Sequence, residues 1–156
     1  MARRVLKCAN VFLAALVVGT MFGIWLGFNP SSLSASAYVE QQQEAIRSLN
    51  VAMPVLGAIS IALTLAHAVW TSAAKASRRF LFAAAVCFLF SGLVTRFGNQ
   101  PINREVMTWS AQSPPRGWQE ERDMWWRWHV VRTTTGVLGL GLLIVATIVG
   151  VGREAG

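Results

Sequence analysis

The sequence predicts an all-α membrane protein, a four-transmembrane-helix bundle with an extramembrane helical lid between the third and fourth helices. Of its 156 residues, 54% are hydrophobic and only 13% are charged, whereas a soluble domain carries about a quarter charged residues. A bilayer core of about 30 Å needs about 20 apolar residues in a helix, and four stretches meet or approach this length and are apolar all round. The predicted spans are residues 5–28, 51–74, 80–97 and 128–151, and residues 98–127 form the lid of a single membrane domain, 1–156.

The charged residues predict how these helices are oriented. Basic residues gather at three helix ends, which we expect to share the cytoplasmic side. They are Arg3, Arg4 and Lys7 before the first helix, Lys75, Arg78 and Arg79 before the third, and Arg153 after the fourth. Both termini of this multi-pass protein are then cytoplasmic, and we expect it in the cell (plasma) membrane. We attribute the formal charge of +7 to contacts with the lipid bilayer, because no basic run interleaved with aromatic residues indicates a nucleic-acid partner.

The first apolar stretch has a second interpretation. Ala35-Ser36-Ala37 resembles a signal-peptidase site that follows a basic start and an apolar run. That run is about 20 residues long, however, against about 7–15 for the central region of a signal peptide. We therefore expect a retained helix.

Glycines and cysteines are expected to serve packing rather than chemistry. The glycines inside the predicted spans include Gly19, Gly23 and Gly27 in the first and Gly136, Gly139 and Gly141 in the fourth. The four-residue spacing in the first helix predicts a close helix–helix seam, and a homo-oligomer stays open. Cys8 and Cys87 form no CxxC pair, so we expect two small buried side chains. The sequence leads us to expect no metal and no cofactor.

The polar segment from Arg96 to Arg132 carries most of the functional information. A loop of about thirty residues is unusually long for so small a protein, and loops of this length often have a function. The segment holds five of the seven tryptophans, Trp109, Trp118, Trp125, Trp126 and Trp128, together with Arg96, Asn99, Asn103, His129 and Arg132.

The start of this segment reads Asn99-Gln100-Pro101-Ile102-Asn103. Pro101 suits the first turn of a new helix, with Asn99 or Gln100 as its cap. Asn99 and Asn103 then bracket a tight turn over the membrane mouth. Simple capping and turn chemistry remains the alternative.

The end of the segment forms a polar stripe. Trp125, His129 and Arg132 stand at i, i+4 and i+7, so they share one helix face. Arg132 lies at or just inside the membrane boundary, where an ionisable residue usually is paired or faces the bundle interior. The alternatives are that Arg132 reaches out to lipid phosphate and that the tryptophans form an interfacial belt.

His67 is the only other histidine, and we expect a packed side chain with its hydrogen bonds satisfied. The topology puts His67 and His129 near opposite membrane faces, so they are not expected to share a metal.

Two elements of the polar segment resemble the anthrone oxygenase-like family of small four-helix membrane proteins. The family shows an Asn-x-Pro-x-Asn element after its third helix, here Asn99 to Asn103. It then shows a Trp-Asn-x-x-Arg element that opens the fourth helix, here Trp128-His129-Val130-Val131-Arg132. His129 stands where the family usually has asparagine.

The resemblance implies oxidation of an anthrone to an anthraquinone with molecular oxygen, without a metal or flavin. Such a reaction must remove a carbon-bound proton, stabilise an oxyanion and hold a flat aromatic body. The candidate catalytic residues are His129 as the base and Arg132 with Arg96 as the fixed positive charge. The candidate substrate-binding residues are Asn99, Asn103, Trp109, Trp125 and Trp128.

Three functions therefore compete. The first is a membrane-embedded oxygenase or oxidoreductase that acts with O2 on an aromatic polyketide-type, anthrone-like or other phenolic substrate. The second is a non-catalytic protein that binds an apolar aromatic small molecule or a partner. The third is a transporter or channel, which is disfavoured because the helices show no chain of charges across the membrane. If the first holds, the candidate residues should point into one pocket.

Overall fold

The computed structural model describes residues 1–70 and 75–151. Its elements are α1 (Ala2–Gly27), the 3-10 turn η1 (Pro30–Ser32), α2 (Ala35–Leu49), α3 (Ala52–Trp70), α4 (Lys75–Val94), the π-helical turn η2 (Thr95–Asn99), α5 (Gln100–Val106) and α6 (Trp118–Val151). The described residues contain no strand, only an isolated bridge between Ser110 and Ser113. The predicted all-α membrane bundle is confirmed. Two predicted positions, the end of the second span at 71–74 and Arg153, lie outside the described residues.

Within the described residues, four helical stretches are long and apolar enough to cross a membrane: Arg4–Ser32, Ala52–Trp70, Lys75–Val106 and Trp118–Gly150. The third and fourth run well beyond the predicted 80–97 and 128–151. Pro101 stands in the first turn of α5, and the π-helical turn η2 leads straight into α5. The lid is therefore built from α5, an irregular stretch at 107–117 and the first turns of α6.

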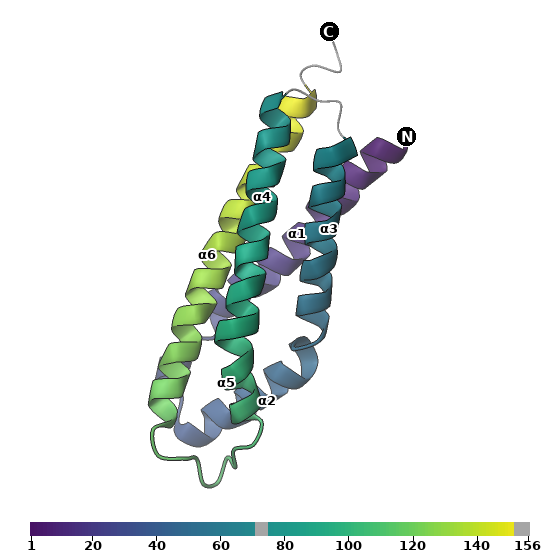
Figure 1. The fold of residues 1–156 in the computed structure, drawn as a ribbon. Coiled ribbons are helices and arrows are strands. Elements are labelled where there is room, and N and C mark those ends of the chain that lie inside the picture. The colour runs from purple at the N-terminus through teal and green to yellow at the C-terminus, as the bar shows by residue number, and fades with distance from the viewer. Residues whose placement is uncertain (71–74, 152–156) are drawn as a thin grey trace.

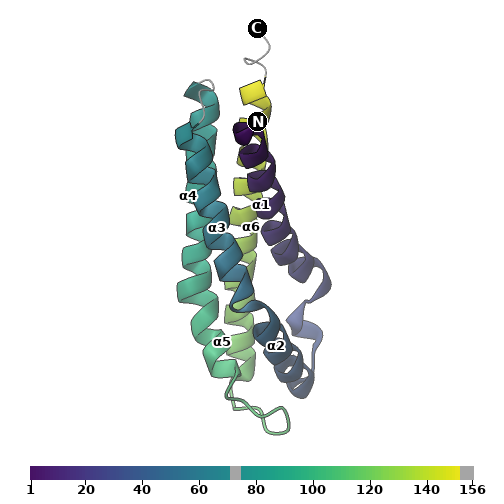
Figure 2. The same cartoon turned by 90° about the vertical axis from the view of Figure 1, so that its right-hand side faces the viewer.

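The helices form one elongated bundle (Figures 1 and 2). The most extensive contact joins α4 and α6, while α3 packs on α4 and the oblique α1 packs on both α3 and α6. The start of α1, the start of α4 and the last turns of α6 lie at one end. The opposite end holds α2, α5 and the loop into α6, so the polar segment and α2 close the bundle there.

Two apolar clusters hold these parts together. The larger joins α1, α3, α4 and α6 and consists of Ala14, Val18, Met21, Ala68, Leu81, Ala84, Phe88, Leu143 and Ala146. The smaller, at the α2 end, consists of Ile46, Ile102, Val106 and Trp125. It ties the polar helix α2 to α5 and α6, so the closing of that end depends on a few side chains.

The glycine seam predicted on α1 is not formed within the chain. A Cβ built at Gly19, Gly23 or Gly27 would meet nothing within 4 Å, because this face of α1 points away from the bundle. The close approach is on α6 instead, where a Cβ at Gly139 would lie 2.8 Å from Cε1 of Phe88. The small residue that matters here lies opposite an aromatic ring rather than opposite another glycine.

The predicted burial of the cysteines is also wrong for Cys8, which is exposed, while Cys87 is half-buried. An apolar neighbourhood in the sequence of a membrane helix is equally compatible with a protein core and with lipid. The sequence around Cys8 therefore could not distinguish the two.

Replacing Gly139 with alanine tests the packing of α4 against α6. The added methyl group would collide with the rigid Phe88 ring, and overpacking of this kind costs about 1–3 kcal/mol of unfolding free energy. The matched control is Gly141→Ala, two residues on, where a Cβ meets nothing within 4 Å. Unfolding in mixed detergent micelles should show a loss for Gly139→Ala only, and equal behaviour of the two variants would contradict the close packing.

Candidate functional site

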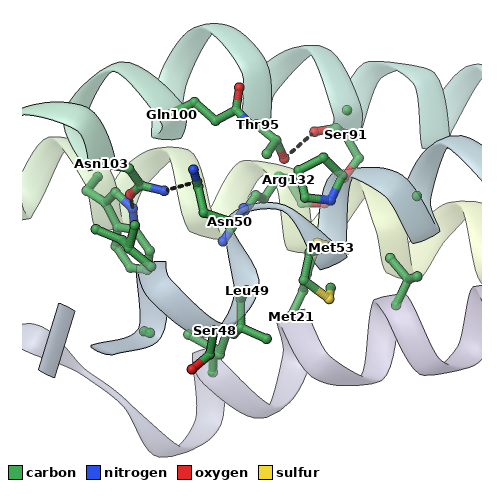
Figure 3. A pocket seen from close by; sticks show the side chains of 18 of the residues that line it. Met21, Ser48, Leu49, Asn50, Met53, Ser91, Thr95, Gln100, Asn103 and Arg132 are labelled. Carbon is green, nitrogen blue, oxygen red and sulfur yellow. Dashed lines mark hydrogen bonds between the residues drawn. The ribbon is translucent and has the colours of Figure 1, made fainter. Parts of the chain in front are cut away.

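The described part of the chain forms a partly open cavity of about 590 Å³ toward the α2 end of the bundle. Its size falls in the range of small-molecule sites, about 300–1,000 Å³. Most of its wall is apolar, with polar side chains from several elements that include Asn50, Ser91, Thr95, Gln100, Asn103 and Arg132. In Figure 3, Asn103, Thr95 and Arg132 lie in the upper half of the view, and Leu49, Met53 and Met21 lie in the lower half. A flat apolar body would thus have Asn103, Thr95 and Arg132 along one side, while Ser48 lies on the other side with the apolar groups.

Arg132 places a positive charge on this wall. Its Nε and Nη2 lie 3.1 and 2.9 Å from Nδ1 of His129, and its guanidinium carbon lies 5.8 Å from the centroid of the Trp125 ring. Within the described residues, no carboxylate forms an ion pair or hydrogen bond with Arg132. From Thr133 to Gly150, α6 rises about 27 Å, so Arg132 lies close to the far boundary of a core about 30 Å thick. Such a charge would be stabilised by an anionic ligand.

His129 lies behind Arg132 and is fully buried. Its ring stacks on Trp125 at 5.1 Å and on Trp126 at 5.5 Å between centroids. A guanidinium can only donate, so Nδ1 of His129 accepts from Arg132. The ring proton is then on Nε2, which donates to the carbonyl oxygen of Met21 over 3.1 Å. His129 is absent from the cavity wall, which differs from the expectation that it faces the substrate.

The Asn-x-Pro-x-Asn element holds Trp125 from two sides. The indole Nε1 of Trp125 donates to Oδ1 of Asn103 over 2.8 Å, and Nδ2 of Asn99 donates to the Trp125 carbonyl over 3.0 Å. Asn103 in turn donates from Nδ2 to Oδ1 of Asn50 over 2.9 Å. Asn103 lines the cavity, whereas Asn99 is fully buried behind it. The Asn99 side chain makes no capping bond, so the element acts as a clamp on Trp125 rather than as a simple cap.

The remaining predicted site residues are not gathered at one point. Arg96 lines the cavity but is exposed, with its guanidinium carbon 5.9 Å from the Phe97 ring centroid. Neither Trp109 nor Trp128 lines the cavity, so their expected stacking on a ligand is not supported there. The Trp109 carbonyl accepts from Nε2 of Gln43 over 2.9 Å. The Trp128 ring covers Gly98 so closely that a Cβ there would lie 2.7 Å from its Cγ.

Several cavity residues escaped the sequence analysis. Asn50, Thr95 and Gln100 bring polar groups, and Met21 and Met53 bring flexible apolar ones. Asn50 follows the last residue of α2. Asparagine is common at helix ends, so its position in the sequence did not indicate a cavity residue. The π-helical turn Thr95–Asn99 became visible only in the structure. Such turns often mark functional sites. In the described residues, no group of three or more His, Cys, Asp or Glu side chains could hold a metal ion.

The fold and the site define a small all-α membrane protein with an internal, mostly apolar cavity and an arginine on its wall. The model of the anthrone oxygenase family matches residues 43–142, and the chain belongs to this family. The matched range runs from α2 into α6 and contains both the asparagine clamp and Arg132. No curated protein and no solved structure is significantly similar to the chain.

Replacing Asn103 with leucine tests the clamp on Trp125. The change leaves the buried indole N–H without its acceptor, and such a loss costs about 1–3 kcal/mol of unfolding free energy. Gln100→Leu is the matched control, because Gln100 also lies on α5 and lines the cavity but makes no hydrogen bond through its side chain with the described residues. If both variants unfold at the same detergent concentration, the clamp does not stabilise the fold.

Proposed function

We propose that this protein is a membrane-embedded oxygenase that oxidises an anthrone-like or related phenolic substrate with O2. The observation that carries the proposal is Arg132, a cation on the wall of an apolar cavity that no described carboxylate contacts. Membership of the anthrone oxygenase family supports the same reaction class.

The proposed reaction needs no external reductant. The substrate CH2 carbon loses one proton and becomes a delocalised enolate, whose negative charge rests largely on oxygen. The enolate carbon gives electrons to O2 and forms a C–O bond, and loss of the second C–H hydrogen with cleavage of the O–O bond yields the ketone. The sum is CH2 + O2 → C=O + H2O, in which four electrons leave the carbon and reduce both oxygen atoms.

Arg132 has the central role in this proposal. A fixed guanidinium beside the enolate oxygen stabilises the charge that develops and needs no reorganisation. Trp125 offers its ring beside that charge, and Asn103 fixes the indole through Oδ1. These contacts support Trp125 and Asn103 as groups that orient a flat aromatic substrate.

His129 enters the proposal as a positioning residue. Both ring nitrogens are engaged, Nδ1 by Arg132 and Nε2 by Met21, so a role as the base would require Arg132 to release Nδ1. Glu44 supplies the only carboxylate in the described cavity lining. Because Glu44 is exposed and forms an ion pair with Arg47 over 3.4 Å, it is the candidate acceptor of the proton through water.

The engaged nitrogens of His129 also favour the second function, non-catalytic binding of an apolar aromatic molecule. A binder needs the cavity and the cation but no base beside them. Oxygen uptake separates the two functions.

For orientation, we propose four membrane crossings with both termini on the cytoplasmic side of the cell membrane. The exposed basic residues Arg4, Lys75, Arg78 and Arg79 belong to the starts of α1 and α4, which supports this by the positive-inside rule. The cavity would then open toward the outer face.

The decisive measurement is oxygen uptake by the purified protein in nanodiscs with an anthrone, after subtraction of spontaneous oxidation. Arg132→Gln should lower kcat/KM by about 100-fold or more, as removal of an oxyanion donor does. Arg127→Gln, five residues earlier on α6 and exposed, is the matched control and should keep its activity. With 18O2, one labelled atom should enter the quinone. Substrate binding without oxygen uptake by the unaltered protein would favour the binder instead.

A pair of variants tests the role of His129. Glutamine can still accept from Arg132 and donate to the Met21 carbonyl, but it takes up no proton near neutral pH. We expect His129→Gln to retain most of the oxygen uptake and His129→Phe to lose it together with stability. Equal, near-complete loss of kcat in both variants, with the unfolding midpoint of His129→Gln unchanged, would instead identify His129 as the base.

A further inference from the structure

A second buried polar cluster lies between α1 and α3, toward the end of the bundle where α1 and α4 begin. Asn10 and Thr64 have no exposed surface, and Ser60 and His67 are each 3% exposed. Ser60, Thr64 and His67 stand at i, i+4 and i+7 of α3 and so share one face. That face is turned toward α1, because the Thr64 hydroxyl lies 2.9 Å from Oδ1 of Asn10.

Three polar atoms of this cluster have no hydrogen-bond partner among the described residues. They are Nδ2 of Asn10, Oγ of Ser60 and Nδ1 of His67. Turning the Asn10 amide over would only exchange the unpartnered nitrogen for an unpartnered oxygen. Buried polar atoms without partners are rare and costly in folded proteins, so three of them in one cluster indicate a missing hydrogen-bonding ligand.

The cluster meets the cavity of the candidate site at Ser60. Ser60 lines that cavity, together with Ala14 of α1 and Ile61 of α3. From Ser60 to His67, α3 rises about 10 Å, toward the end of the bundle where α4 begins. Buried groups that are spread over about 10 Å of one helix and need both donors and acceptors are satisfied more readily by separate water molecules than by one organic molecule.

We propose that Asn10, Ser60, Thr64 and His67 form a buried water site. It extends the cavity from Ser60 toward the end of the bundle where α1 and α4 begin. One water molecule donates to Nδ1 of His67 or accepts from it, according to the ring tautomer, and others bond the Asn10 amide and the Ser60 hydroxyl. The site does not depend on the proposed oxygenase activity. It brings solvent molecules to the otherwise apolar wall near the centre of α3.

X-ray hydroxyl-radical footprinting of the full chain in nanodiscs tests the site without any turnover. Radicals form from bound water, so His67 should be labelled far faster than its 3% exposure allows. Leu81 has no exposed surface and lies in the apolar cluster, so it serves as the internal control, after correction for intrinsic reactivity. In the double variant Asn10→Leu with Ser60→Ala, the labelling of His67 should fall several-fold. Labelling of His67 no faster than that of Leu81 would overturn the proposal.

The unfolding midpoint of Ser60→Ala is an independent test, because it should fall if the site binds water and should not fall if the site is empty. Ser60→Ala should lower the unfolding midpoint if the hydroxyl binds water, and it should raise the midpoint or leave it unchanged if the hydroxyl has no partner. Ser77→Ala is the matched reference, because Ser77 is equally buried and donates to the carbonyl oxygen of Ala146 over 2.8 Å. A fall for both variants supports the water site, and a fall for Ser77→Ala alone contradicts it.

Discussion

The structure depends on how it accommodates the positive charge of Arg132 near the edge of the membrane core. An ionised side chain at that depth is expensive unless it has a partner, and no described carboxylate supplies one. His129 provides an acceptor without a negative charge, so the guanidinium is held in place while its charge stays uncompensated. A fixed and uncompensated cation beside an apolar cavity is stabilised when an anion forms there, which links the energetics of the fold to the proposed oxyanion chemistry.

The surrounding elements keep this arrangement rigid. The His129 ring stacks on Trp125 and Trp126 and donates to the Met21 carbonyl, which ties α6 to α1. On the other side, the clamp on Trp125 ties α6 to the π-helical turn and α5. Gly98 lets the Trp128 ring approach that turn closely. Because the contacts with Met21, Asn99 and Asn103 join α6 to α1, η2 and α5, the orientation of Arg132 depends on several elements of the bundle.

Much of the fold and part of the site follow from the sequence, for physical reasons that differ. The spans were predictable because hydrophobic length is a local property, and the shared face of Trp125, His129 and Arg132 was predictable because helical spacing fixes it. Which member of that face reaches the cavity was not, since this depends on the neighbouring helices. Asn50 gave no signal, because its partner Asn103 is 53 residues away. The glycine spacing on α1 was misleading because lipid-facing and buried helix faces have the same composition.

The residue at position 129 bears on how the chemistry is shared between protein and substrate. The family resemblance puts asparagine where this chain has His129, and the amide of asparagine is not a base near neutral pH. Histidine and asparagine do share one acceptor and one donor, which are the two functions that His129 uses toward Arg132 and the Met21 carbonyl. If the two residues serve the same purpose, that purpose is to hold the arginine. In the proposed reaction, an anthrone carbon whose enolate is stabilised by the fixed guanidinium would need only a weak proton acceptor, so the catalytic demand would rest on the cation rather than on a strong base.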